Sequence, residues 1–559
     1  MSGSSDWGRV VHVPATEREF SWRPLLHLTV LTAAAVAVRL LFIASYPTGW
    51  DDVDFALALN QYDLSRMQPH FPGYPVYILL GHLFDLRPDN PFFALSLLSA
   101  VAGGFTIIPL WLLFHRMGPA PVARLAVWLY SLAPLPLVMS IQPMSDSLGA
   151  FFAAWVAYCA WRAADGMGCQ LVAAGVALGL LLGVRVSYLP LAALWLYAIL
   201  YAVRRREIPV KWRVRSAVIS AGAVGVTCFV WLAALVHSTG GIDSFLTLAL
   251  SFTGGHFSDW GGAYHAGDSL AERAKLFFLR QIGAAGVGTV WWENDSANGH
   301  PATWSWAFGW RWIGTISVFV GIAGLVGRLR LRGPAANQGE FRLTRKQAAF
   351  LFIWIVPYLL WAFFAQNVEK PRHILPLLPP ILYLLAAGMW RFSAFAAQQR
   401  FLQRAIFTMV GVVWLAGVTG VSVPLLREAH AAESPMMQLA RYVAANVPVD
   451  DSLIFAWEEQ RVLNYVTPAH TVIRLRKWED FRTEILQYEK PPARIFATNA
   501  LLDGMDRDVR GLFREVREFR GNPWLYPTYH TIVLYEAAPL LYDQLRQGKG
   551  ELAWKSKRY

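Results

Sequence analysis

The chain has 559 residues, of which 55% are hydrophobic and only 16% are charged, and its mean hydropathy is +0.35. A soluble domain usually has about 25% charged residues, so this chain is too poor in charge to cover a surface that faces water. The composition excludes an ordinary soluble protein and predicts that lipid surrounds most of the molecule.

The formal net charge of +12 has more than one interpretation. Such a charge is typical of proteins that bind nucleic acid, of proteins on anionic membranes, and of membrane proteins with Arg-rich cytoplasmic loops. Here Lys and Arg lie between apolar runs, which favours cytoplasmic loops. We therefore expect membrane lipid as a partner and no nucleic acid.

Helices that cross a bilayer need about 20 mostly apolar residues. The sequence predicts a mainly α, polytopic bundle of about eleven such helices, of which the two around Arg185 are the shortest. Residues 1–24 precede the first run without the features of a cleavable signal peptide. The apolar runs are 25–46, 92–114, 122–140, 147–163, 171–184, 188–203, 216–237, 312–327, 348–364, 374–390 and 405–425.

The distribution of basic residues predicts the orientation of the bundle. With residues 1–24 in the cytoplasm, the inner segments hold 21 Lys and Arg, whereas the longer outer segments hold 9. This asymmetry agrees with the excess of positive charge in cytoplasmic loops of membrane proteins. The sequence thus predicts a multi-pass protein of the cell inner membrane with a cytoplasmic N-terminus, and an odd number of spans places the C-terminus outside.

The distribution of apolar runs and charges divides the chain into two predicted domains. A transmembrane domain covers 25–429 and has two long outer loops, 47–91 and 238–311. The first loop contains a short apolar run, 76–84, that predicts a helix at the membrane interface. Residues 430–559 regain charge and predict a small extracytoplasmic α/β domain. Its expected elements are a helix at 436–446 and strands at 452–457, 471–475, 493–498 and 531–535.

Two acidic groups fall on the predicted outer face. Trp50-Asp-Asp-Val-Asp-Phe55 places Asp51, Asp52 and Asp54 within four residues, where they repel one another and are costly to desolvate. Such a cluster favours a proton, metal or cation site, although a solvated helix cap is the alternative. Asp146, at the start of the fourth predicted helix, either caps that helix or joins the same site.

Basic groups lie at the same face. Arg185 stands between two short apolar runs, and Glu369-Lys-Pro-Arg-His373 precedes the tenth. Lys and Arg at this depth suit an anionic headgroup, and the alternative is a side chain that extends to the interface. Acids and phosphate-binding bases together indicate transfer from a lipid-linked phosphate. One carboxylate would deprotonate an acceptor, the bases would stabilise the departing phosphate, and direct displacement would invert the anomeric centre.

At these residues the chain resembles the GT-C membrane glycosyltransferases, over about residues 25–425. The similarity is to the bacterial branch related to protein O-mannosyltransferases and the lipid A aminoarabinose transferase. It implies a polyprenyl-phosphate sugar donor and three catalytic residues: Asp51 as base, Asp52 in a supporting role, and Asp146, which matches a family Asp at the start of the fourth helix. It also implies that Arg185, Lys370 and Arg372 bind the donor phosphate. Further substrate or supporting residues are Asp54, His70, Tyr74, Glu369 and His373.

The sequence leaves several alternatives open. His70-Phe-Pro-Gly-Tyr-Pro75 replaces a Glu-Lys-Pro-Pro stretch of the aminoarabinose transferase branch, so the sugar and the acceptor (protein, lipid or glycan) are undetermined. No cofactor is certain, and the acids leave a divalent metal open. A transporter or flippase for anionic lipid-linked substrates and a non-catalytic membrane scaffold are the alternative functions.

Overall fold

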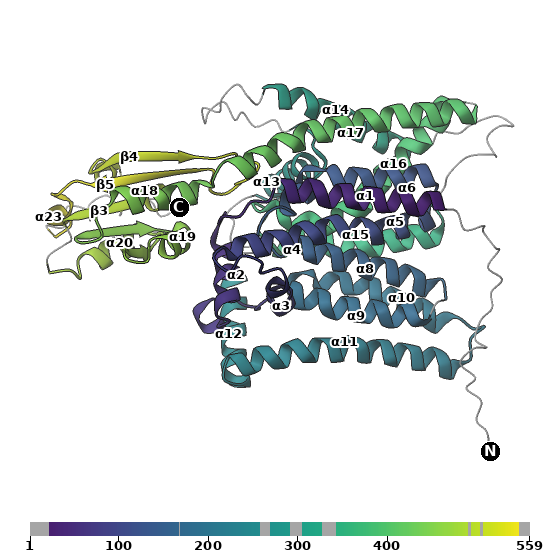
Figure 1. Cartoon of the computed structure of the whole chain (residues 1–559), viewed down its shortest axis with the longest axis horizontal. Coiled ribbons are helices and arrows are strands. Elements are labelled where there is room, and N and C mark those ends of the chain that lie inside the picture. The colour runs from purple at the N-terminus through teal and green to yellow at the C-terminus, as the bar shows by residue number, and fades with distance from the viewer. Residues whose placement is uncertain are drawn as a thin grey trace, which may run out of the picture.

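The computed structural model describes residues 22–166, 168–257, 269–290, 305–326, 343–397, 399–489, 493–502 and 507–546. Its long helices run side by side along the longest axis of the molecule, and a small sheet with its own helices lies at one end of this bundle (Figure 1). The fold is therefore mainly helical with a separate α/β part, as the sequence predicts.

Each predicted apolar run overlaps a helix, although α1 ends at Leu41, before the end of the run at 25–46. The run at 92–114 is interrupted by a break at Thr106, and the runs at 188–203 and 374–390 begin in a short 3-10 helix that contains proline. The bundle consists of α1 (Trp22–Leu41), α4 (Pro91–Phe105), α5 (Ile107–Met117), α6 (Ala120–Leu132), α7 (Pro134–Met139), α8 (Asp146–Ala164), α9 (Gly168–Val184), η3 (Val186–Leu191), α10 (Ala192–Arg204), α11 (Val210–Ser238), α14 (Ser305–Val326), α15 (Arg345–Ala365), η9 (Pro371–Leu377), α16 (Leu378–Ala396) and α17 (Arg400–Ala431).

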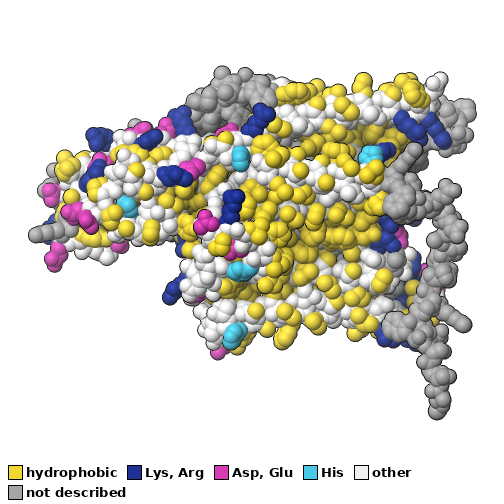
Figure 2. Space-filling view, viewed as in Figure 1, with side chains coloured by type: hydrophobic (Ala, Val, Ile, Leu, Met, Phe, Trp, Pro, Cys, Tyr) yellow, Lys and Arg dark blue, Asp and Glu magenta, His cyan; other side chains and the backbone are white. Residues whose placement is uncertain are grey.

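The apolar surface of the bundle identifies a multi-pass membrane protein. Hydrophobic side chains cover its flank, whereas charged side chains gather over the sheet and near the ends of the helices (Figure 2). Seven described spans are long and apolar enough to cross a bilayer, and three shorter helices are also apolar. The predicted total of about eleven spans stays a prediction.

The two outer segments are more helical than the sequence predicts. The short helix expected at 76–84 is α3 (Pro75–Leu83), but the acidic motif before it also forms a helix, α2 (Trp50–Asn60), followed by η2 (Leu64–Arg66). The second segment contains α12 (Ile242–Gly255), α13 (Leu270–Ala274) and a π-helix, η5 (Lys275–Val287). The rest of this segment, at 258–268 and 291–304, lies outside the described residues.

The C-terminal part is built on a five-stranded sheet of order β2-β1-β3-β5-β4. β1 pairs in parallel with β2 and β3, whereas β5 is antiparallel to β3 and β4. The strands are β1 (Ser452–Ala456), β2 (Thr471–Arg474), β3 (Arg494–Thr498), β4 (Phe513–Arg520) and β5 (Thr531–Ala537). The helices are α18 (Pro435–Asn446), α19 (Glu459–Val466), α20 (Trp478–Ile485), α21 (Asn499–Leu502), α22 (Arg507–Arg510) and α23 (Leu541–Arg546).

Four of these strands and α18 agree with the sequence-based prediction, and β4 does not appear in it. β4 reads Phe-Arg-Glu-Val-Arg-Glu-Phe-Arg, which is too charged to predict a buried strand. Charges are tolerated there because β4 is an edge strand that pairs only with β5 and exposes much of its surface.

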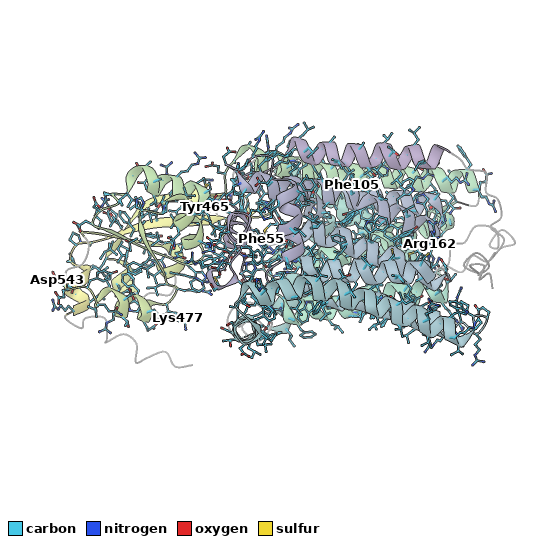
Figure 3. The ribbon with its side chains drawn as sticks, turned by 60° about the horizontal axis from the view of Figure 1, so that its bottom comes forward. Phe55, Phe105, Arg162, Tyr465, Lys477 and Asp543 are labelled. Carbon is cyan, nitrogen blue, oxygen red and sulfur yellow. The ribbon has the colours of Figure 1, made fainter. Side chains whose placement is uncertain are left out.

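Helix α2 packs into both parts of the molecule. Its Val53 and Ala56 are buried in one apolar cluster with residues of α18, α19 and the sheet. Its Phe55, Ala58 and Leu59 are buried in a second cluster with α3, α4 and α9. Figure 3 shows Phe55 at the junction of the bundle and the sheet. The acidic helix is thus held on one side by the membrane part and on the other by the C-terminal part.

Glycines allow α14 and α16 to approach closely. A β-carbon at Gly388 of α16 would collide with the carbonyl oxygen of Gly321 in α14, and one at Gly324 would collide with that of Gly388. Small residues that let helix backbones touch are typical of contacts between helices in membranes. We expect this contact to set the spacing of the two helices.

Gly388→Val should destabilise the protein by about 2 kcal/mol, because the added side chain has no space at this contact. Thermal unfolding in detergent measures the change. The matched control is Gly222→Ala in α11, where a β-carbon meets nothing within 4 Å. An unchanged melting temperature for Gly388→Val would contradict the close contact.

Candidate active site

The acidic motif forms the first turn of α2. Gly49 at the N-cap is extended, and carboxylates in a first helical turn are stabilised by the helix dipole. The backbone N–H and the hydroxyl of Thr48 both donate to Oδ2 of Asp52, at 2.6 and 2.5 Å. Burial raises the pKa of Asp52 to about 6, although the Thr48 hydrogen bonds oppose this shift. The motif is a helix start, but Asp52 is only 1% exposed and is not a solvated cap.

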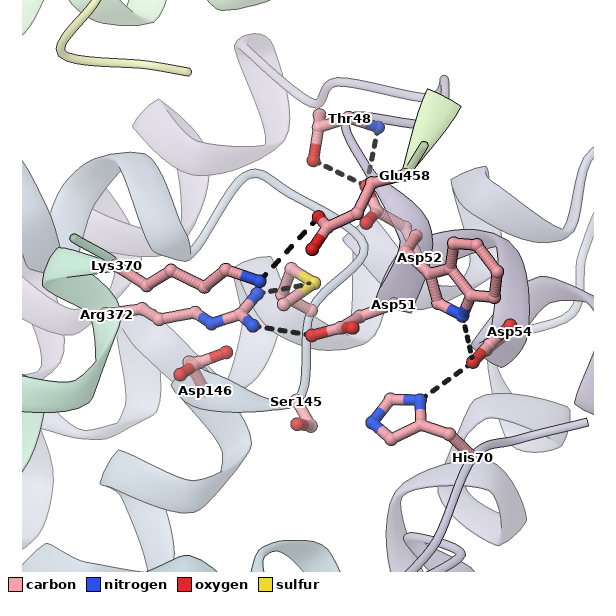
Figure 4. A network of polar contacts seen from close by, with 12 residues as sticks. Thr48, Asp51, Asp52, Asp54, His70, Ser145, Asp146, Lys370, Arg372 and Glu458 are labelled. Atoms are coloured by element: carbon pink, nitrogen blue, oxygen red, sulfur yellow. Dashed lines mark hydrogen bonds and ion pairs between the residues drawn. The ribbon is translucent and has the colours of Figure 1, made fainter. Parts of the chain in front are cut away.

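Asp51 has a different environment on the same turn. Its Oδ2 accepts a 2.5 Å hydrogen bond from Nη2 of Arg372, in η9. Burial by itself would raise the pKa of Asp51, but the charges of Arg372 and Lys370 and the hydrogen bond from Arg372 lower it well below its usual value. Adjacent carboxyls therefore have pKa values shifted in opposite directions. Figure 4 shows Lys370 and Arg372 reaching toward Asp51.

A second acid–base pair lies at the start of α8. Nη1 of Arg185 donates to Oδ2 of Asp146 at 3.0 Å and to Oγ of Ser145 at 2.9 Å. Asp146 is fully buried and Arg185 is 5% exposed. The other oxygen of Asp146 and the Nε of Arg185 have no hydrogen-bond partner among the described residues. Buried polar groups normally have partners, so this site has unused capacity to bind a polar group.

Asp54 lies on the other side of α2 and is fully buried. Its Oδ2 accepts from Nε1 of Trp50 at 3.1 Å and contacts Nδ1 of His70 at 2.9 Å. The other ring nitrogen of His70 lies 3.0 Å from the hydroxyl of Tyr74. The structure thus brings three of the predicted supporting residues, Asp54, His70 and Tyr74, into one chain of contacts.

The other two predicted supporting residues are placed differently. Glu369 is exposed and does not line the cavity at the acids, and its backbone N–H donates to Asn367. His373 is half-buried, and its carbonyl oxygen accepts from the hydroxyl of Tyr358 at 3.0 Å. The structure gives Glu369 no contact with the acids.

A cavity opens beside Asp51 and Asp52 between the bundle and the C-terminal part. One wall is a single stretch of the β4–β5 connection, Trp524–Tyr529. Glu458, before α19, also lines it and lies 3.9 Å from Nζ of Lys370. From the bundle it is lined by Thr48, Gly49, Trp50, Asp51, Asp52, Pro134, Leu135, Val138, Met139, Gln142, Met144, Ala284, Ala285, Arg311, Lys370, Pro371, Arg372 and Leu425.

Sequence reasoning missed the residues that the C-terminal part contributes. Glu458 reaches the cavity, and Nε of Arg461 donates to Oδ1 of Asp54 at 2.6 Å. Both lie some 400 residues from the acids, and no local pattern marks them. Thr48 was also missed, although a hydroxyl residue just before an acidic helix start is a recognisable signal.

The described residues offer no assembled metal site. Among them, no group of three or more His, Cys, Asp and Glu side chains lies close enough to hold an ion. The carboxylates of the acidic motif are instead bound by Thr48, Arg372 and Arg461.

Comparisons with known proteins address the fold. No protein-family model matches the chain, and a search of curated proteins found no match. Among solved structures, ArnT from Cupriavidus metallidurans bound to undecaprenyl phosphate is similar at a TM-score of 0.51 and 14% identity, over 93% of this chain and 99% of that one. Its apo form is similar at 0.50 and 13%, over 92% and 98%.

The archaeal oligosaccharyltransferase AglB from Archaeoglobus fulgidus has a TM-score of 0.47 at 13% identity, over 93% of this chain and 77% of that one, which is too distant to support an argument. The similarity to ArnT along almost the whole of both chains confirms the GT-C fold that the sequence motifs indicate.

The buried carboxyl of Asp52 predicts a pH-dependent stability. Because folding raises its pKa from 3.8 to about 6, its contribution to stability is full below about pH 4 and is lost as the pH rises through 6. Relative to Asp52→Asn, the wild type should therefore gain up to about 3 kcal/mol between pH 8 and pH 4.

Thermal unfolding of wild type and Asp52→Asn between pH 4 and pH 8 measures this difference in stability. Groups that titrate in the same way in both proteins do not contribute to it. Asp89→Asn, an exposed acid of the same outer segment, is the matched control and should follow the wild type. Parallel curves for wild type and Asp52→Asn would contradict the raised pKa.

Proposed function

We propose that the protein is a membrane glycosyltransferase that moves a sugar from a polyprenyl-phosphate donor to an acceptor hydroxyl or amine at the outer face of the membrane. The observation that carries this proposal is the Asp51–Arg372 contact of 2.5 Å in the wall of a cavity. This contact of a carboxylate with a guanidinium supports a base that lies beside a phosphate-binding group. ArnT, which shares the fold, binds undecaprenyl phosphate, and this supports a donor of the same kind.

The donor phosphate would replace Asp51 at Arg372. A guanidinium has five N–H donors and binds phosphate in a bidentate manner. Arg372 uses Nη2 for Asp51 and has a 3.9 Å contact from Nη1 to the Met144 sulfur, whereas its Nε has no partner among the described residues. A phosphate bound there has Lys370 near it and frees the carboxylate of Asp51.

The freed carboxylate then acts as the general base. The acceptor oxygen or nitrogen attacks the anomeric carbon, the bond from that carbon to the phosphate oxygen breaks, and Asp51 takes the acceptor's proton. Arg372 and Lys370 stabilise the charge on the departing polyprenyl phosphate. Direct displacement inverts the anomeric centre. Asp52, held by Thr48, supports the turn that carries Asp51.

Arg185 and Asp146 do not line the cavity, but both interact electrostatically with Arg372, which does, and we propose that they extend the site. Their unpartnered Nε and Oδ1 atoms suit the phosphate and a sugar hydroxyl of the donor, respectively. The pair is buried, so each of these contacts would be stronger than in water.

The proposed orientation has a cytoplasmic N-terminus and an extracytoplasmic C-terminal domain. In support, α2, α3 and α12 lie at the end of the bundle that faces the sheet (Figure 1). Arg162, from a predicted cytoplasmic segment, lies at the other end (Figure 3). The cavity therefore faces the compartment of the C-terminal domain, where a lipid-linked donor and an acceptor meet.

Asp51→Asn should reduce transfer at least about a hundredfold, because the proposed base is removed. The measurement is release of free polyprenyl phosphate by purified protein from a panel of polyprenyl-phosphate sugars, with a membrane extract as acceptor source. Asp89→Asn is the matched control and should retain activity. Equal turnover by wild type and Asp51→Asn would contradict the role of Asp51, and no release from any donor would contradict the proposed function.

The pH profiles of kcat and kcat/KM should have acid limbs at different pH values. In the free enzyme Arg372 lowers the pKa of Asp51, so the limb of kcat/KM that reports this group lies at low pH. When the donor phosphate occupies Arg372, that lowering is weakened and the pKa of Asp51 rises. The acid limb of kcat should therefore lie at higher pH than that of kcat/KM, measured in Asp52→Asn to remove the neighbouring titration. Coinciding limbs would contradict the exchange at Arg372.

A further inference from the structure

We propose that Arg461 of the C-terminal domain is a positioning residue that holds α2 in place, so that docking of this domain aligns Asp51 with Arg372. This inference rests on the proposed function for its effect on turnover. Its structural content, the attachment of α2 by Arg461, stands on contacts that can be tested separately.

Asp54 is the point of attachment. It is fully buried, and both of its oxygens have partners: Oδ1 accepts from Nε of Arg461 at 2.6 Å, and Oδ2 contacts Trp50 and His70. A carboxylate with its oxygens occupied in this way is poorly placed to take a proton from a substrate. We therefore infer that Asp54 organises the site and does not react.

Arg461 joins α19 to two neighbouring segments that lie about 400 residues earlier in the sequence. Besides Asp54, its Nη2 donates to the carbonyl oxygens of Met67 at 2.7 Å and Arg66 at 3.3 Å. These two carbonyls belong to the turn after α2, where Met67 has a left-handed φ of 57°. One side chain from α19 thus holds α2 and the turn that follows it.

Apolar packing continues this attachment. Val462 and Leu463, which follow Arg461 in α19, are fully buried in the cluster that contains Val53 and Ala56 of α2. The charge pair therefore lies at the edge of a shared apolar core, where separation of the domains would expose both. Breaking a buried ion pair by removing one partner leaves an uncompensated charge and is strongly unfavourable.

Asp54 and the proposed base Asp51 lie close together on the same helix. Asp54 is three residues from Asp51 on a helix of 11 residues, so a tilt of α2 at Asp54 also moves Asp51. The Asp51–Arg372 contact joins α2 to η9 and is the geometry on which the proposed reaction depends. A displacement of about 1 Å in a catalytic group can reduce a rate about a hundredfold.

Arg461→Gln tests the proposal in the full-length protein in detergent. We expect hydrogen exchange at residues 53–60 to become at least about fivefold faster, because the helix loses its attachment. In the donor assay, kcat should fall at least about tenfold with KM for the donor changed less than threefold, because the residue positions the base and does not touch the donor. Arg461→Lys retains the charge without the forked geometry and should give intermediate values.

The matched control is Arg441→Gln. Arg441 lies on α18 of the same domain and makes a 2.6 Å ion pair with Glu433, but its side chain is 65% exposed. Removing it should change neither exchange at 53–60 nor kcat, since exposed ion pairs contribute little. Hydrogen exchange in β1 and β3 reports whether the C-terminal domain of each variant stays folded. If the domain unfolds in Arg461→Gln, the exchange and kcat of Arg461→Lys test the proposal.

The outcomes separate this inference from the proposed function. Unchanged exchange at 53–60 in the Arg461 variants would overturn the inference, and so would faster exchange with unchanged kcat. Without turnover by the wild type the proposed function fails, while the exchange measurement still decides whether Arg461 holds α2. A rise in donor KM equal to the fall in kcat/KM would show that Arg461 acts in binding and would also overturn the positioning role.

Discussion

Buried and half-buried carboxylates at the end of the bundle that faces the sheet need partners, and arginines from other segments of the chain provide them. Asp51 contacts Arg372 of η9, Asp146 contacts Arg185 before η3, and Asp54 contacts Arg461 of α19. An unpaired buried charge is far more costly than a paired one, so each contact ties its two segments together. These three pairs connect α2 to η9 and to α19 of the C-terminal part, and α8 to the segment before η3.

The three ion pairs differ in whether their polar atoms all have hydrogen-bond partners. Both oxygens of Asp54 have partners, whereas Arg372, Arg185 and Asp146 each keep a polar atom without a partner among the described residues. This difference separates a closed structural contact from contacts that a phosphate and a sugar can extend. It also explains how three aspartates within four residues can have different roles, because their partners and not their residue type distinguish them.

The elements around the candidate site are held together by apolar side-chain packing and by a close contact between helix backbones. Val53 and Ala56 join α2 to the sheet part, Phe55 joins it to the bundle, and the glycines of α14 and α16 bring two long helices into contact. The β4–β5 connection then closes one side of the cavity. A site enclosed in this way strengthens the electrostatic contacts on which phosphate recognition depends.

The sequence alone determined the membrane class and predicted that Asp51, Asp146, Arg185 and Arg372 share one face, and the resemblance of its short motifs to a known family indicated the GT-C fold. These follow from apolar run length, charge asymmetry and short motifs, which are local properties of the chain. Only the tertiary structure decided which acid meets which base, that α2 is a helix shared by two parts, and that Glu458, Arg461 and Trp524–Tyr529 belong to the site. Such contacts join residues that are 39, 321 and 407 positions apart, and they arise from packing that no local periodicity records.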